Sequence, residues 1–200
     1  MDIDPLAANG NLRKYQNPNP LHRWLLKRFV GRVQAVVAPL AGTRILDAGC
    51  GEGFMLQGLR AALPDRQFCG LDLRPEALEF ARGLNTGCEL RVGSLYALPF
   101  TDGEFELTIC LEVLEHLEDP ARALREIARV TQNDVVLSVP WEPFFSLGNL
   151  ARGHHVRRCG RDPDHRNFWS LREFTRLVGT VLTIRHAEVF FPWIIVTARK

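Results

Sequence analysis

The stretch ILDAGCGEGFML, from Ile45 to Leu56, restricts what this chain can fold into more than any other part of the sequence. Two apolar residues lead into Asp47, glycines then alternate with other residues, and an apolar run with helical spacing follows. Glycine adopts backbone conformations with positive φ and lets other groups approach the main chain closely. The pattern therefore predicts a buried strand that ends at Asp47, a tight glycine loop, and a helix that begins near Phe54.

The rest of the chain repeats this alternation of strand and helix. Apolar and β-branched runs predict strands at residues 44–49, 67–73, 88–93, 105–113, 134–140, 181–190 and 193–199. Helical spacing of apolar residues predicts helices at 21–38, 54–63, 75–84, 119–130 and 171–178. Such strands pair in parallel through right-handed crossovers, so we expect an α/β protein with a doubly wound sheet. Residues 141–170 are an irregular stretch that is longer than a packing loop needs to be.

Composition indicates a soluble globular protein of one domain. The 200 residues suffice for a sizeable core, and 46% hydrophobic and 24% charged residues are ordinary values. The net charge of +2 does not favour nucleic acid as a partner. The five cysteines form no Cys-x-x-Cys pair, no apolar run approaches the roughly 20 residues of a membrane span, and the acidic N-terminus is unlike a signal peptide. We therefore expect a cytoplasmic protein without a membrane segment, either a monomer or a weak homodimer.

The glycine loop predicts a ligand site, because ligands of open α/β sheets bind beyond the carboxyl ends of the strands. The helix after Gly49, Gly51 and Gly53 would direct free N–H groups and a positive dipole end at this place, which favours a phosphate or carboxylate. Asp72 lies 19 residues beyond Gly53, where a carboxylate can accept hydrogen bonds from both ribose hydroxyls. The structural alternatives are a turn without a ligand and a helix cap at Asp72. Loop and acid together predict a ligand that contains a nucleoside.

Nicotinamide dinucleotide and S-adenosylmethionine are the two candidates for this ligand. The dinucleotide fingerprint Gly-x-Gly-x-x-Gly, counted from Gly49, requires a third glycine at position 54, which is Phe54. Asp47 would repel a pyrophosphate, but its charge suits the ammonium group of a methionine. The residues thus favour S-adenosylmethionine, and an NAD-dependent oxidoreductase is the weaker interpretation.

At this point the sequence resembles a known family, the class I S-adenosylmethionine-dependent methyltransferases, through ILDAGCGEG, GLDLRPEALEFAR, GSLYALPFTDGEFELTICLEVLEHLEDPARALREIARV and DVVLSVP. The resemblance covers residues 43–140 and is closest to the type 11 branch, which includes ubiquinone and menaquinone methylases and many small-molecule methyltransferases. It implies a Rossmann-like seven-stranded sheet, mostly parallel with an antiparallel last strand, and an N-terminal helical lid. Residues 1–200 would form a single class I methyltransferase domain, with a lead segment and helix at 1–40 and a substrate-side insertion at 141–170.

The resemblance also implies a site for S-adenosylmethionine at the strand ends. Its members are Asp47, Gly49, Cys50, Gly51, Gly53, Asp72, Leu73, Ser94, Leu95, Leu111 and Glu112. The glycine loop with Asp47 would bind the methionine portion, Asp72 the ribose, and residues 94–95 the border of the adenine. Many relatives carry Asp where this chain has Ser94, and a hydroxyl bonds the adenine amino group more weakly than a carboxylate does.

Two histidines are candidate catalytic bases, His116 in EVLEHLEDP and His165 in DPDHRNFWS. Methyl transfer from a sulfonium requires mainly that the acceptor be aligned and water excluded, and a base is needed only if the acceptor must lose a proton. The alternative for His116 is a residue that packs at a helix entry. The alternative for His165 is a loop anchor.

The insertion at 141–170 is where we expect acceptor specificity, because loops at strand ends carry function while the sheet stays fixed. Candidate substrate residues are Tyr15, Trp141, Arg157, Arg158 and Trp169. Adjacent guanidinium groups suit a carboxylate or phosphate, and a solvated basic surface loop is the alternative. His154, His155, Cys159 and His165 do not have the spacing of a standard zinc site, so we expect no metal.

The sequence therefore predicts S-adenosylmethionine-dependent methyl transfer to a small-molecule acceptor, possibly one with an acidic group. A non-catalytic protein that binds the cofactor for regulation is one alternative, and a methyltransferase acting on RNA or protein is another. The identity of the acceptor, and whether oxygen, nitrogen or carbon is methylated, are left open.

Overall fold

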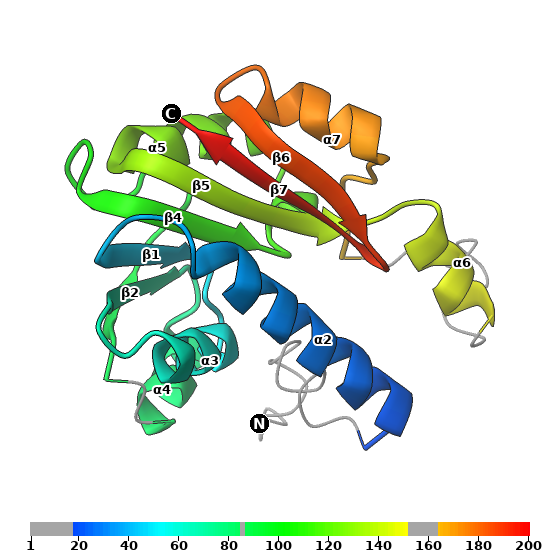
Figure 1. The fold of residues 1–200 in the computed structure, drawn as a ribbon, viewed down its shortest axis with the longest axis horizontal. Helices are drawn as coiled ribbons and strands as arrows, with labels where there is room; N and C mark the ends of the chain where they lie inside the picture. Colours follow the sequence, from blue (N-terminus) through cyan, green and yellow to red (C-terminus); the bar gives the residue numbers. More distant parts are fainter. Residues whose placement is uncertain (1–17, 85–86, 152–163) are drawn as a thin grey trace, which may run out of the picture.

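A seven-stranded sheet forms the centre of the computed structural model, which describes residues 18–84, 87–151 and 164–200 (Figure 1). The strands are β1 Arg44–Ala48, β2 Gln67–Asp72, β3 Glu89–Val92, β4 Phe105–Leu111, β5 Thr131–Pro140, β6 Thr183–Phe190 and β7 Trp193–Arg199. Their order is β3-β2-β1-β4-β5-β7-β6, with β1 to β5 parallel and β7 antiparallel to both of its neighbours. The doubly wound sheet with an antiparallel last strand is thereby confirmed.

Helices cover both faces of this sheet. One face packs against α2 Pro20–Val37, α3 Phe54–Ala62 and α4 Pro75–Gly83, and the other against α5 Pro120–Val130 and α7 Leu171–Val178. A short 3₁₀ helix, η1 Leu114–His116, follows β4, and α6 Phe144–Ala151 follows β5. Because strand side chains alternate between faces, Ile45 belongs to the first core and its neighbour Leu46 to the second.

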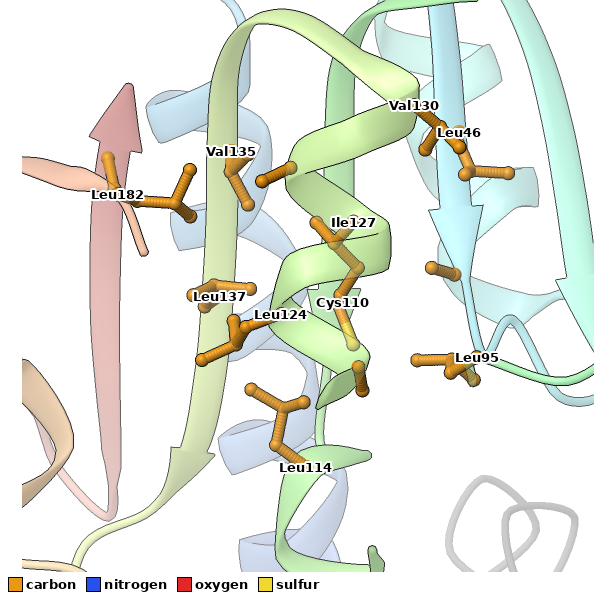
Figure 2. Packing of buried hydrophobic residues seen from close by; sticks show 14 of the residues in the cluster. Leu46, Leu95, Cys110, Leu114, Leu124, Ile127, Val130, Val135, Leu137 and Leu182 are labelled. Atoms are coloured by element: carbon orange, nitrogen blue, oxygen red, sulfur yellow. The ribbon is translucent and has the colours of Figure 1, made fainter. Parts of the chain in front are cut away.

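The second core shows how this pattern holds the fold together. Figure 2 shows Leu124, Ile127 and Val130 of α5 directed at the sheet, where Val135 and Leu137 of β5 lie. All five side chains are fully buried. Burying a side chain of this size contributes about 1.5–3 kcal/mol, so this interface alone is a large stabilising term.

The N-terminal helix α2 is divided between core and surface. Asn19 begins it by accepting hydrogen bonds from the N–H groups of Leu21 and His22. Phe29 and Val33 in its second half are buried, and the ring of Phe29 stacks on Trp193 at 4.5 Å. The first half extends beyond the sheet (Figure 1). A lid over the site remains a proposal for this half.

The insertion at 141–170 is not wholly irregular, contrary to the sequence expectation, because it contains α6. Pro143 precedes this helix, and the Glu142 carboxylate accepts hydrogen bonds from the main chain and hydroxyl of Ser146. The apolar sequence FFSLGNLA conceals the helical period, which explains why the pattern missed it. Across the described ranges, no helix is long and apolar enough to cross a membrane.

Candidate active site

The glycine loop adopts the conformation that its composition predicts. Gly49, Gly51 and Gly53 have φ values of 92°, 53° and 78°, a region that residues with side chains rarely adopt. The N–H of Gly49 donates to the carbonyl of Leu71 at 2.7 Å, which fastens the loop to β2. A Cβ atom at Gly49 would lie 2.5 Å from Cγ2 of Val113. The loop therefore needs glycine here both for its backbone and for its contact with the segment after β4.

Asp72 lies at the end of β2 and links the loop to the next helix. One carboxylate oxygen accepts the N–H of Gly51 at 2.8 Å, and the other accepts the N–H of Arg74 at 2.9 Å. The N-cap of α4 is Arg74, whose side chain makes no capping hydrogen bond, so Asp72 is not the cap of this helix. A carboxylate has about four lone-pair sites, so Asp72 can still accept from ribose hydroxyls.

Asp47 has the most unusual electrostatic environment in the loop. Its side chain is 3% exposed, and one of its oxygens, Oδ2, has no hydrogen-bond partner among the described residues. Burial, together with the nearby charge of Asp72, raises the pKa of Asp47 to about 7. A buried carboxylate of this kind is stabilised by a cation. The ammonium group of a methionine fits this requirement, and a pyrophosphate does not.

A second buried carboxylate lies beside the loop. Glu52 is fully buried, and both of its carboxylate oxygens lack a hydrogen-bond partner in the described structure. The Arg74 guanidinium lies 3.5 Å from one of these oxygens. Sequence reasoning missed Glu52, although its place between Gly51 and Gly53 was a signal. Glu52 thus adds a second buried carboxylate next to the glycine loop.

The end of β4 places Glu112 beside the loop in a strained conformation. Glu112 has a φ of 58°, and it is the residue other than glycine with a positive φ among the residues described. Its carboxylate accepts hydrogen bonds from the Ser138 hydroxyl at 3.0 Å and from the Trp193 indole at 2.9 Å. Such strain persists where the surroundings fix it, and it is concentrated at functional sites. Leu111, just before it, is half-buried.

The residues expected around the adenine lie at the ends of β2 and β3. Leu73 is 65% exposed, so its side chain is available to a ligand, and Leu95 is buried. The Ser94 hydroxyl accepts the N–H of Tyr96 at 3.2 Å. Cys50 is buried within the loop, and burial raises the pKa of its thiol well above the ordinary value. Cys50 therefore shapes the turn as a neutral side chain.

The two candidate bases lie together, although they are 49 positions apart in the sequence. The rings of His116 and His165 meet edge to face with centroids 5.0 Å apart. Nδ1 of His116 lies 2.9 Å from the carbonyl oxygen of Asp164, and His165 is 9% exposed. The structure thus brings the end of the insertion to the segment after β4.

Trp141 and Trp169 lie at the two ends of the insertion, and their main chains form an isolated parallel β-bridge. The ring of Trp141 stacks on Phe144 with centroids 4.2 Å apart. Trp24 on α2 is 53% exposed, with the Arg28 guanidinium over its ring. The remaining candidates, Tyr15, Arg157, Arg158, His154, His155 and Cys159, lie outside the described residues.

Comparison with known proteins agrees with this geometry. A family model described as a methyltransferase domain matches residues 46–139, the part that contains the glycine loop, Asp72 and Glu112. Over these residues the chain resembles the class I S-adenosylmethionine-dependent methyltransferases. The matched residues include the glycine loop and the ends of β1, β2 and β4.

Two relatives illustrate the similarity. A ubiquinone biosynthesis O-methyltransferase of Thiobacillus denitrificans is 33% identical over 161 residues, which are 77% of this chain and 62% of the relative. The crystal structure of magnesium protoporphyrin IX methyltransferase from Synechocystis, with bound SAH, superposes with a TM-score of 0.73 and 18% identity, covering 94% of this chain and 92% of that one. The chain spans between 36% and 62% of the length of the curated relatives it matches.

Other residues, some of them outside the matched segment, support the site and were not expected from the sequence. Val113 fills the space that Gly49 leaves, and Trp193 of β7 holds Glu112. The side-chain amide of Asn167 donates to the carbonyl of Leu117 at 2.7 Å, joining the insertion to the segment after η1. These contacts join residues that are far apart in the sequence, so no local sequence pattern could predict them.

Proposed function

We propose that this chain transfers the methyl group of S-adenosylmethionine to a small-molecule acceptor. The observation that carries the proposal is the unpartnered Oδ2 atom of the buried Asp47 carboxylate, beside a glycine loop that Asp72 holds in place. The loop offers negative charge for an ammonium group, and Asp72 retains acceptor capacity for a ribose. The match of residues 46–139 to a methyltransferase domain supports the same assignment.

The bound cofactor supplies an already electrophilic methyl group, so the protein has to place the acceptor atom about 3 Å from it and exclude water. Asp47 and the glycine loop orient the methionine portion, and Asp72 orients the ribose. Leu73 and Leu95 would border the adenine, with Ser94 as a hydrogen-bonding neighbour. Glu112, held by Ser138 and Trp193, would limit the cavity beside the methionine. None of these residues has to take part in covalent chemistry.

For the acceptor, we propose an oxygen-bearing small molecule that contacts the insertion at 141–170. The name of the Thiobacillus relative, an O-methyltransferase of ubiquinone biosynthesis, supports a small hydroxylated acceptor. Trp141 and Trp169 would provide aromatic surface, and Arg157 and Arg158 would hold an acidic group if the acceptor carries one. Tyr15 and the first half of α2 would cover the cleft as a lid. His116 and His165 are the groups that would assist proton loss from a hydroxyl.

Transfer of labelled methyl groups tests this function. The purified chain is incubated with methyl-labelled S-adenosylmethionine and three acceptor sets, namely hydroxylated aromatic acids, RNA, and a protein mixture. Labelled product from the first set alone supports the proposal. Product from RNA or protein would replace the acceptor class, and no product from any set, with the cofactor bound, would favour a regulatory binding protein.

A double variant tests the hypothesis that the acceptor carries an acidic group. Replacing Arg157 and Arg158 together with Ala should weaken acceptor binding by several kcal/mol if they hold a desolvated acidic group, and should leave cofactor affinity nearly intact. Arg172 and Arg176, exposed on α7, form the matched control pair. Unchanged acceptor binding would make Arg157 and Arg158 ordinary surface charges.

A further inference from the structure

We infer that Glu115, His116 and His165 form a binding site for a divalent transition-metal ion. One potential ligand atom from each of the three lies within 4.8 Å of the other two, a grouping found in the described part of the chain. Two imidazoles and one carboxylate are a donor set that first-row transition metals use when they keep open positions for other ligands. Neither this set nor an ion here was expected from the sequence, which pointed to no metal.

The hydrogen bond of His116 determines which of its nitrogen atoms can bind an ion. Nδ1 lies 2.9 Å from the carbonyl oxygen of Asp164, and a carbonyl only accepts hydrogen bonds, so Nδ1 carries the proton. Neutral His116 therefore has its lone pair on Nε2. Histidine ligands of metals commonly donate their other N–H to a carbonyl in this way, which orients the ring.

The distance between His116 and Glu115 also suits an ion better than a direct contact. Nε2 of His116 lies 3.9 Å from Oε1 of Glu115, too far for a hydrogen bond between them. Two metal–ligand bonds of about 2.0–2.2 Å join atoms up to about 4.3 Å apart, so an ion can bridge this pair. The three ligand atoms lie within 4.8 Å of one another, and around one tetrahedral ion they would lie about 3.4 Å apart, so the side chains have to move together by about 1 Å to complete the set.

The scaffold around the three side chains is fastened by main-chain hydrogen bonds. The N–H groups of Arg166 and Asn167 donate to the carbonyl of Glu115 at 2.8 and 3.0 Å. The segment that carries His165 is thereby fixed on η1, and the buried Glu115 side chain, 1% exposed, has little freedom. The charge of Arg166 is directed to Glu118, with which it forms an ion pair. A fixed scaffold favours binding because little side-chain freedom is lost.

The place of this site suggests what the ion would do. Val113, which adjoins η1, contacts Gly49 of the glycine loop, so the ion would lie next to the proposed cofactor. When bound, the ion supplies a Lewis acid that can hold an acceptor oxygen and ease the loss of its proton. This role, unlike the binding of the ion itself, rests on the proposed function, and it would make His116 and His165 ligands in place of bases.

Ion binding can be measured without any activity assay. The full chain is stripped with a chelator and dialysed against Zn²⁺ or Mn²⁺, and bound ion is counted by elemental analysis and, for Mn²⁺, by electron paramagnetic resonance. We expect one ion per chain. His116→Ala and His165→Ala should each weaken binding by more than about 100-fold, because losing a group behind a ligand already costs about 10–100-fold. Circular dichroism checks folding, and His116 is exposed enough (39% of its side chain) for the first variant to fold.

Matched controls separate this site from others. Glu79→Gln removes an exposed carboxylate on α4, and His186→Ala removes an exposed imidazole on β6, and both should bind like the wild type. Titration of each variant with S-adenosylhomocysteine distinguishes failure of the metal site from failure of the proposed function. The inference is wrong if the wild type binds no ion at millimolar concentration. It is also wrong if binding survives His116→Ala and His165→Ala and disappears when His154 and His155 are replaced.

Discussion

The raised pKa of Asp47 makes a prediction about stability that can be worked out from the structure. The pKa is about 7 in the folded protein against an ordinary value of 3.8, because burial and the charge of Asp72 disfavour ionisation. The folded state therefore holds this proton more tightly than the unfolded chain does. The stability that protonated Asp47 contributes to the fold is fully present below pH 3.8. It decreases as the pH rises toward about 7 and does not change further at higher pH.

The magnitude follows from the two pKa values. Each pKa unit corresponds to about 1.36 kcal/mol, so ionised Asp47 lowers the stability of the cofactor-free protein by about 4 kcal/mol at pH 8. Of this, about 2.5 kcal/mol develops between pH 5 and pH 8. Asp47→Asn removes the titrating group. The free energy of unfolding of the variant, relative to the wild type, should therefore increase by about 2.5 kcal/mol over that interval.

Urea unfolding at pH 5 and pH 8, without cofactor, measures this difference. Costs of the substitution that do not depend on pH cancel, which leaves only the titration. Asp65→Asn, at an exposed carboxylate, is the matched control and should follow the wild type at both pH values. If Asp47→Asn and the wild type change in parallel between the two pH values, Asp47 is not a destabilising buried charge, and the electrostatic basis of the proposed ammonium site is lost.

Three further substitutions test individual contacts. Asp72→Ala should weaken S-adenosylmethionine binding by about 2–3 kcal/mol in calorimetric titrations, with exposed Glu79→Ala as the unaffected control; equal affinities would place the nucleoside elsewhere. Gly49→Ala should lower the free energy of urea unfolding by at least about 1–3 kcal/mol, since it forces an alanine to a φ of 92° and onto Val113; a neutral change would mean that the loop adapts. Ser170→Ala removes the capping box of α7 and should lower the thermal unfolding stability by about 1 kcal/mol, with the same cofactor affinity as the wild type; a change in affinity would connect α7 to the site.

Sequence reasoning succeeded where local signals determine the structure. The bounds of α7, Leu171–Val178, were predicted at both ends, and the capping box between Ser170 and Glu173 is a local signal of the start. The same applies to the glycine loop, whose positive φ values follow from Gly49, Gly51 and Gly53. The ends of β1 and β2, which place Asp47 and Asp72, follow from the limits of their apolar runs.

What the sequence could not predict depends on contacts between distant residues. The helix α6 lies in an apolar run without a helical period, and its first turn is fixed by Glu142 and Ser146. The contact of Trp193 with Glu112 spans 81 positions. The grouping of His116 with His165 depends on hydrogen bonds between η1 and the end of the insertion. Such pairings arise from the topology of the sheet, which periodicity does not encode.

The central claim is that the glycine loop and Asp72 bind the nucleoside and methionine portions of one cofactor. Calorimetric titration of the purified chain with S-adenosylhomocysteine, repeated with Asp72→Ala, tests it most directly. We predict one binding site per chain in the wild type and an affinity about 30–150-fold lower in the variant, which corresponds to about 2–3 kcal/mol. No binding by the wild type at millimolar concentration, with the protein folded, would contradict the account.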